Sequence, residues 1–366
     1  MTAYLRRLAA VVALLAMLVG CAGVEEGAPA QTAATEPAMP QTQPREELPA
    51  EPAEDAAAVW ARTLESPEEG CVFVYDPGAR EMIYCSDDPG DMLYPASITK
   101  LFTAWVALRF LAGDETVTVG WELGMLEPGS SSAFLALDSR LTVEDLIQGM
   151  LLPSGNDAAL VLAAAVGRKL AGDKNTTARE AVALFVEEMN RAAEALGMDG
   201  THFANPHGYH AGDHYSCPED LGLMAALALE EPMIRRTVAL SQVTVTAKTG
   251  QVHTWTNTNR LVRDSLEGFC PEALGLKTGY TDAAGYCLLG AFDSETPLVV
   301  GVFGSTDGES RYETALELYR SAKEAGVQTA ALYGGVEECS GNQQYDGLTQ
   351  RHIHGIEPEG TADIDG

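Results

Sequence analysis

The order of the predicted strands and helices limits the folds available to this chain. Strand-like apolar runs occur at 71–75, 81–85, 243–248, 274–278, 286–292 and 298–304. Between the early and late strands, helical spacing predicts helices over 97–112, 141–166 (broken at 153–156), 179–196 and 219–228, and a closing helix over 311–325. A helical block inserted between strands from both ends of the folded region predicts an α+β domain with an antiparallel sheet.

The first twenty residues resemble an export signal rather than part of the fold. Arg6 and Arg7 precede an apolar run from Leu8 to Val19, which is too short to span a bilayer. The run ends at Gly20-Cys21, in a pattern similar to the lipobox of bacterial lipoproteins. We therefore expect a lipoprotein signal peptide over 1–20 and lipidation of Cys21, and the alternative is an ordinary secretory signal cut nearby. Either reading predicts an extracytoplasmic protein, and lipidation would attach it to the cell membrane.

Composition divides the remainder into three predicted parts. Residues 21–55 are rich in Ala, Pro, Glu, Gln and Thr and have almost no large apolar side chain, so they predict a disordered tether. Residues 56–326 carry the folded domain. Residues 327–366 are polar and acidic and predict a disordered tail. The formal net charge of −30 repels phosphate backbones, so we expect no nucleic-acid partner.

Ser97-Ile98-Thr99-Lys100 is the first stretch that suggests chemistry. It opens a predicted helix, which places Ser97 at the N-terminus and Lys100 one turn further along the same face. Backbone N–H groups and the positive end of the helix dipole would lie beside the serine hydroxyl. A neutral lysine there can accept the hydroxyl proton, although such a tetrad alone is far more often a simple helix cap.

Two later motifs change that interpretation. The three occur in a fixed order: Ser97-Ile98-Thr99-Lys100, then Ser154-Gly155-Asn156, then Lys277-Thr278-Gly279. This set resembles the S-x-x-K, S-x-N and K-T-G motifs of penicillin-binding proteins and serine β-lactamases. The resemblance implies an antiparallel five-stranded sheet flanked by helices, with an inserted all-helical subdomain.

The residue types suggest a role for each member of the set. Ser97 would attack a carbonyl carbon and carry the acyl group, with Lys100 as its base. Desolvation and a nearby Lys277 cation would both favour a neutral Lys100. Ser154 would relay a proton to the leaving amine, and Asn156 would orient Lys100 and bind the substrate amide.

The third motif would bind the other end of the substrate. Lys277 and Thr278 would meet a substrate carboxylate, and Gly279 would let the strand approach closely. The backbone N–H groups of Ser97 and Tyr280 would hold the oxyanion.

Lys248-Thr249-Gly250 repeats the third motif but lies in a different context. It is followed by polar residues, whereas a turn after Lys277 leads into two more apolar strands and the closing helix. We therefore place Lys277 in the site, on an inner hairpin packed against the Ser97 helix, and treat Lys248 as incidental.

Further segments are similar to D-alanyl-D-alanine carboxypeptidases of the low-molecular-mass penicillin-binding class. They are Leu276–Thr281, Ala284–Leu288, Met189-Asn190, Thr201–Gly208 and Asn257–Arg260. This resemblance implies that Arg311 helps to hold the terminal carboxylate. Many members of this class carry a second, β-rich domain and a C-terminal amphipathic helix, and we find neither in this sequence, so the expected lipid on Cys21 would take over the anchoring. The chain departs from serine β-lactamases as well: it carries Ser-Gly-Asn instead of Ser-Asp-Asn, and we find no Glu-x-x-x-Asn loop for deacylation.

The cysteines and histidines give weaker signals. Cys71 and Cys85 flank a predicted hairpin and would face each other, either as a disulfide or as two thiols. His202, His207, His210 and His214 lack the spacing of a metal-ligand set, so we expect no metal and no cofactor.

The resemblance implies a serine DD-carboxypeptidase that removes the terminal D-alanine from peptidoglycan stem pentapeptides and is acylated by β-lactams at Ser97. A β-lactamase and a DD-endopeptidase or transpeptidase share the motifs and remain alternatives. A non-catalytic muropeptide-binding lipoprotein is a further alternative, from a different functional class.

Overall fold

The computed structural model describes residues 55–67, 70–293 and 296–332. The chain divides into Met1–Pro52 and Ala53–Gly366, and every described residue belongs to the second part. The predicted signal peptide, Cys21, and most of the tether and tail therefore lie outside the described residues. Within the described ranges, no helix combines the length and apolarity needed to cross a membrane.

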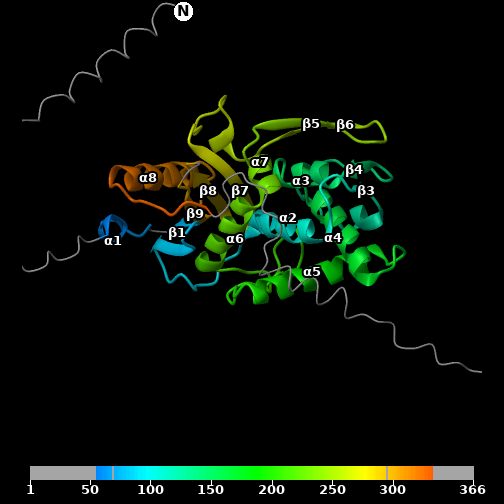
Figure 1. Ribbon diagram of the computed structural model, residues 1–366, viewed down its shortest axis with the longest axis horizontal. Coiled ribbons are helices and arrows are strands. Elements are labelled where there is room, and N and C mark those ends of the chain that lie inside the picture. The colour runs from blue at the N-terminus through cyan, green and yellow to red at the C-terminus, as the bar shows by residue number, and fades with distance from the viewer. Residues whose placement is uncertain (1–54, 68–69, 294–295, 333–366) are drawn as a thin grey trace, which may run out of the picture. The chain divides into compact units, whose positions relative to one another are not determined.

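A five-stranded antiparallel sheet joins the two ends of the described region, as the order of strands predicted (Figure 1). Its strand order is β2-β1-β9-β8-β7, with β1 paired to β9 so that Phe73 lies opposite Gly301. The bounds are β1 (Cys71–Asp76), β2 (Glu81–Cys85), β7 (Ala273–Thr281), β8 (Gly285–Phe292) and β9 (Leu298–Ser305). The α+β class and the antiparallel sheet are thus confirmed.

Both faces of this sheet are buried, because successive residues of a strand point to opposite sides. In β1, Phe73 and Tyr75 belong to the larger core on the side of the helical region. Val72 and Val74 belong to a smaller core beneath α8 (Ser310–Glu324), where Phe292 stacks on Tyr319 with ring centroids 4.4 Å apart. This two-sided burial explains why the strands read as continuous apolar runs.

The helical region lies between β2 and β7 in sequence and extends beyond one end of the sheet (Figure 1). At its centre is α2 (Thr99–Phe110), in which every residue from Thr99 to Ala107 is buried. The other helices of this region are α3 (Val143–Leu151), α4 (Asn156–Ala171), α5 (Ala178–Ala195), α6 (Pro218–Glu230) and α7 (Pro232–Val238), whereas α1 (Ala56–Ala61) precedes the sheet in the chain. Because α2 is enclosed, its first turn is a rigid support for the residues that precede it.

Several short elements were missing from the sequence prediction. They are the helices α1 and α7 and the strands β3 (Thr116–Thr118), β4 (Arg140–Thr142) and β6 (Val252–Thr256), which pairs with β5 (Gln242–Thr246). Three-residue strands offer no readable alternation, and β6 exposes polar residues that favour a loop interpretation. The prediction of an inner hairpin was also wrong in detail, because β7 is an edge strand of the sheet.

The first residues of the predicted tail contact the domain. The Ala330 N–H donates to Asp76 at 2.8 Å, and the Thr329 hydroxyl donates to the Thr296 carbonyl at 2.7 Å. The described structure therefore continues to residue 332, six residues past the predicted domain boundary.

Cys71 and Cys85 lie on the same face of the β1–β2 hairpin. Cys85 pairs with Phe73, so Cys71 is its diagonal neighbour, and the two sulfur atoms are 3.9 Å apart as thiols. The hairpin brings them together as expected, and their oxidation to a disulfide stays a prediction.

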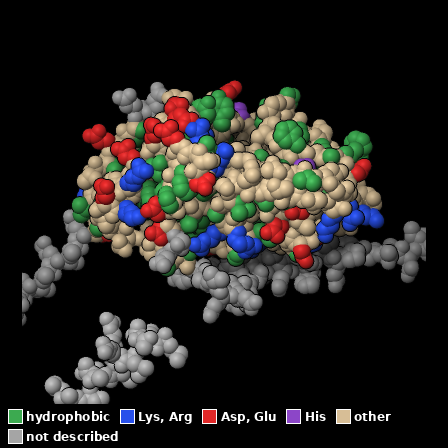
Figure 2. Space-filling view, turned by 90° about the horizontal axis from the view of Figure 1, so that it is seen from above, with side chains coloured by type: hydrophobic (Ala, Val, Ile, Leu, Met, Phe, Trp, Pro, Cys, Tyr) green, Lys and Arg blue, Asp and Glu red, His purple; other side chains and the backbone are tan. Residues whose placement is uncertain are grey.

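Figure 2 shows acidic, basic and hydrophobic side chains interspersed on one face of the domain. The basic side chains visible on this face are separated by acidic, apolar and uncharged ones.

Candidate active site

Ser97 lies in a 3₁₀ turn (Ala96–Ile98) that leads directly into α2. Lys100 is one turn further on, and its Nζ donates hydrogen bonds to Ser97 Oγ at 2.8 Å and to the His207 carbonyl oxygen at 2.7 Å. Lys100 is fully buried, whereas Ser97 is partly exposed. The pair therefore has an accessible hydroxyl backed by a desolvated amine, which is the arrangement that proton abstraction from serine requires.

Burial holds the pKa of Lys100 well below the usual value for lysine, and the charge of Lys277 lowers that pKa further. The carboxylates of Asp157 and Glu127 oppose this shift. Near neutral pH, a lysine with a strongly lowered pKa is neutral in a larger fraction of the protein molecules than an ordinary lysine is. Only the neutral amine can accept a proton. The neutral Lys100 expected from the sequence thus has a physical cause in the structure.

Strand β7 forms the second side of the site, next to the turn that carries Ser97. A Cβ atom built on Gly279 would lie 3.0 Å from Ala96 Cβ and 3.2 Å from Ser97 N. A larger residue would push the strand away from the nucleophile, so glycine permits the close approach that the sequence predicted.

Lys277 and Thr278 are also buried on β7. Lys277 Nζ donates to the Thr278 carbonyl at 2.9 Å, and the Thr278 hydroxyl shares a hydrogen bond with that of Thr258 at 2.8 Å. Burial, together with the charge of Arg311, lowers the pKa of Lys277 to about 7. A bound anion would favour the charged form of this lysine.

Tyr280 lies further along β7, and Arg311 contacts β7 and β8 from the start of α8. The Arg311 guanidinium donates to the carbonyl oxygens of Gly279 at 3.2 Å and Cys287 at 3.0 Å, which ties the start of α8 to β7 and β8. The Tyr280 side chain is exposed, and its hydroxyl donates to Asp282 at 3.0 Å. Arg311 thus helps to hold β7 in position through these two hydrogen bonds.

Ser154 lies in the break between α3 and α4, as predicted, and Asn156 is the first residue of α4. The Ser131 hydroxyl donates to the Ser154 carbonyl at 2.6 Å, and the Asn156 N–H donates to the Ser131 carbonyl at 2.9 Å. Asn156 Oδ1 is buried and accepts no hydrogen bond from the described residues. The predicted orientation of Lys100 by Asn156 is not seen, because Lys100 donates its hydrogen bonds to Ser97 and His207; the Asn156 amide oxygen is left available for another donor.

The Asn205-Pro206-His207-Gly208 turn supports the site from behind, a role that the sequence interpretation missed. Asn205 Oδ1 accepts hydrogen bonds from the N–H groups of His207, Gly208 and Tyr209 and so fixes the turn. A Cβ atom built on Gly208 would lie 1.8 Å from the Ala96 carbonyl oxygen, and Gly208 has a φ of +83°. The His-Gly pair in this turn was a visible signal, but its contact with Lys100 depends on tertiary structure.

Three of the seven non-glycine residues with positive φ in the described region lie in or beside the three motifs. Ala96 and Ser154 have φ values of +47° and +63°, and Leu276, just before Lys277, has a φ of +75°. Each such non-glycine residue costs about 1–3 kcal/mol and persists only where its surroundings fix it. Each of the three motifs thus has one such residue in it or directly beside it.

Lys248, by contrast, is exposed between β5 and β6. Its N–H donates to the Arg140 carbonyl, and the neighbouring Thr249 hydroxyl accepts from the Arg140 N–H. The second Lys-Thr-Gly is therefore a structural turn, and Lys277 is the lysine beside Ser97 and Lys100.

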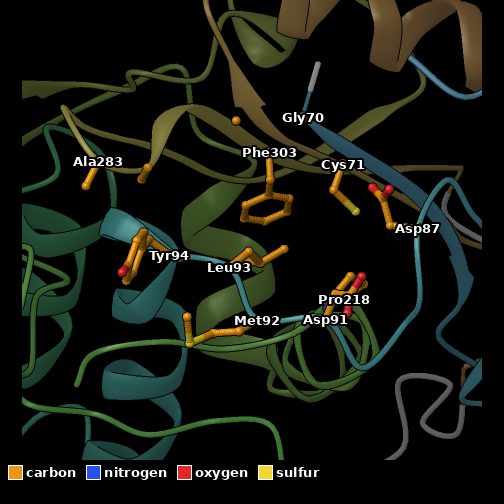
Figure 3. Close-up of a pocket in the computed structure, with 12 residues that line it drawn as sticks. Gly70, Cys71, Asp87, Asp91, Met92, Leu93, Tyr94, Pro218, Ala283 and Phe303 are labelled. Atoms are coloured by element: carbon orange, nitrogen blue, oxygen red, sulfur yellow. The ribbon is translucent and has the colours of Figure 1, made fainter. Parts of the chain in front are cut away.

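A separate cavity of about 350 Å³ is lined in part by Leu93, Phe303 and Cys71, whose side chains project toward it (Figure 3). It reaches Tyr94 and Ala284, but neither Ser97 nor either site lysine lines it. Among the residues with described positions, no group of three or more His, Cys, Asp or Glu side chains is arranged to hold a metal ion.

Comparisons with known proteins agree with this geometry. The D-alanyl-D-alanine carboxypeptidase family model matches residues 73–306. The D-alanyl-D-alanine carboxypeptidase of Streptomyces sp. (strain K15) is 34% identical over 233 residues, 61% of this chain and 76% of the relative. Escherichia coli DacD is 32% identical over 252 residues, which make up 66% of this chain and 60% of DacD. Bacillus subtilis DacF is 29% identical over 249 residues, 64% of this chain and 59% of DacF.

The match therefore spans about three fifths of the length of the DacD and DacF relatives. Among solved structures, the Streptomyces K15 DD-transpeptidase superimposes with a TM-score of 0.63 at 30% identity. That comparison covers 71% of this chain and 100% of the K15 chain.

Proposed function

We propose that this chain, which belongs to the D-alanyl-D-alanine carboxypeptidase family, is a serine peptidase that removes the terminal D-alanine from peptidoglycan stem pentapeptides. The observation that carries the proposal is the 2.8 Å hydrogen bond between the buried Lys100 amine and the accessible Ser97 hydroxyl. A protein that only bound muropeptides would have no need for a desolvated base next to a serine that is partly exposed.

The first step is acylation. Neutral Lys100 takes the proton of Ser97 Oγ, and the oxygen attacks the carbonyl carbon of the penultimate D-alanine. The oxyanion that forms accepts hydrogen bonds from the backbone N–H groups of Ser97 and Tyr280. Proton transfer through Ser154 to the amide nitrogen lets D-alanine leave, and the remaining peptide becomes an ester on Ser97.

Substrate orientation depends on two further contacts. The terminal carboxylate lies against Thr278 and the Lys277 cation, and Arg311 adds positive charge from the start of α8. The buried Asn156 Oδ1, which accepts no hydrogen bond from the described residues, takes the N–H of the substrate backbone. Water then attacks the ester and restores Ser97.

Mass spectrometry tests the proposal directly. Incubation with a stem pentapeptide should release D-alanine and leave the tetrapeptide, and incubation with penicillin should add the antibiotic's mass to the peptide that contains Ser97. Persistence of the penicillin adduct separates a carboxypeptidase from a β-lactamase, which would lose it quickly. An intact pentapeptide and no adduct would refute the proposal.

Transpeptidation is a second candidate, favoured by the likeness to the Streptomyces K15 DD-transpeptidase. The same acyl-enzyme can pass its peptide to an amine instead of water. Adding an amino-acid acceptor to the pentapeptide reaction decides, because a cross-linked product would then form at the expense of the free tetrapeptide.

Replacing Lys277 by glutamine should raise the KM for the pentapeptide about 10- to 100-fold, because a charged hydrogen bond to the carboxylate is lost. It should also move the acid limb of Ser97 acylation to higher pH, since the cation that lowers the pKa of Lys100 is gone. Steady-state kinetics and acylation rates measured across pH check both effects.

Lys248→Gln is the matched control, because Lys248 begins the same Lys-Thr-Gly tripeptide but lies in an exposed turn. Its kinetics should equal those of the wild type. Equal effects of the two substitutions would place the carboxylate site elsewhere.

We further propose that Cys21 is lipidated and holds the enzyme at the outer side of the cell membrane, where stem peptides occur. The sequence before Cys21 supports this location. Cys21→Ala should move the protein from the membrane fraction to the soluble or secreted fraction. Unchanged membrane association would argue for another means of attachment.

A further inference from the structure

In the peptide group between Ala96 and Ser97, the N–H faces the proposed oxyanion and the carbonyl oxygen faces the protein interior. Its N–H is the Ser97 N–H assigned to the oxyanion, and its carbonyl oxygen is that of Ala96. A trans peptide points these two groups in opposite directions. Whatever binds the carbonyl therefore sets the direction of the N–H.

Thr99 binds that carbonyl oxygen. Its hydroxyl donates to Ala96 O at 2.8 Å, and its backbone N–H donates to the same oxygen. Thr99 is completely buried, so water does not compete for this hydrogen bond. Gly208 closes the other side of the carbonyl, which leaves little room for the peptide group to rotate.

His214 continues the chain of hydrogen bonds. Its Nε2 lies 2.8 Å from Thr99 Oγ1, and its Nδ1 accepts the N–H of Ala204 at 3.1 Å. Burial lowers the pKa of His214 to about 4, so the ring is neutral at neutral pH. Because Nδ1 is an acceptor, the single ring proton is on Nε2 and is donated to Thr99.

We propose that Thr99 and His214 are positioning residues that hold and polarise the Ala96–Ser97 peptide group for oxyanion binding. The donors run in one direction, from His214 Nε2–H to the Thr99 hydroxyl and then to the Ala96 carbonyl. Aligned hydrogen bonds polarise one another, and a carbonyl that accepts them makes the N–H of the same peptide a stronger donor. This inference rests on the proposed acylation of Ser97.

The test is the rate of Ser97 acylation by a chromogenic β-lactam, resolved into a binding constant and an acylation rate constant. Thr99→Val keeps the side-chain shape but removes the hydroxyl. We expect an acylation rate constant about tenfold lower, less than the loss of a whole oxyanion donor, and a binding constant within twofold of the wild type. Thr99→Ser restores a hydroxyl and should recover most of the rate.

His214→Phe keeps a ring against Phe203, which lies edge-on to it at 5.8 Å, but removes both nitrogens. Alone it should slow acylation severalfold, and in the Thr99→Val background it should slow it no further. Such non-additivity is expected only if His214 acts through Thr99, whereas two independent packing defects would add.

Melting temperatures of all variants, measured alongside, separate loss of fold from loss of positioning. A Thr99→Val protein that is folded and acylates at the wild-type rate would overturn the inference. If Thr99→Val does not fold, the acylation rate of His214→Phe decides: a severalfold decrease supports the inference, and a wild-type rate in a folded protein overturns it. If the wild-type protein is not acylated at all, the proposed function itself fails, which is a different result.

Discussion

Ser97→Ala is expected to lower D-alanine release by a factor on the order of 10⁶, as removal of a catalytic serine does in other serine peptidases. The physical reason is that, among the described residues, Lys100 Nζ donates its hydrogen bonds to this hydroxyl and to the His207 carbonyl, so Ser97 is the nucleophile beside the base. Covalent labelling by penicillin should disappear together with the activity. D-Alanine release and labelling on a denaturing gel measure the two effects.

Ser265→Ala is a suitable control, because this serine is exposed on the loop before β7 and lies outside the site. It should leave both activity and labelling intact. Retained penicillin labelling in Ser97→Ala would show that another residue is acylated and would remove the basis of the mechanism.

Lys100→Met should reduce the rate of Ser97 acylation by about 10²- to 10⁴-fold, the usual contribution of a general base. In the wild type, this rate should rise with pH as Lys100 loses its proton, and the limb should lie well below the pKa of an ordinary lysine, because burial lowers it. In the methionine variant this limb should vanish. Stopped-flow acylation measured from acid to alkaline pH tests both statements.

The same substitution should not lower the melting temperature. A fully buried amine costs free energy to desolvate, whereas the methionine side chain has a similar length and no such cost. Loss of activity together with an equal or higher melting temperature would show that Lys100 serves catalysis rather than stability. A large loss of stability would instead make it a structural residue.

Much of the fold was predictable, because its main elements have strong periodicity. The five strands of the sheet and the break at Ser154 were readable from apolar runs and turn residues, and α2 was placed within two residues. Elements such as β3 and α7 were not, since they are short and are held by contacts with distant segments.

The sequence predicted the candidate reactive residues of the site, but not the residues that hold them in position. The three motifs identified Ser97, Lys100 and Lys277, because each chemistry needs that residue type. The contact of the His207 carbonyl with Lys100 and the hydrogen bond from His214 to Thr99 could not be read from sequence. Both link residues separated by more than a hundred positions, and histidine gives no sign in sequence of whether its backbone or its ring will be used.

The pairing of β1 with β9 has a consequence for how the protein acquires activity. Phe73 pairs with Gly301, so the sheet cannot close until almost the whole described region has emerged from the ribosome or the export channel. Such long-range pairing makes folding slow, because a large loop must close before the contacts form. The strand that carries Gly279 reaches Ser97 only as part of that sheet, so a partly emerged chain would have a serine without its oxyanion site. Catalytic competence would then arise late in folding, once the last strands of the sheet have paired.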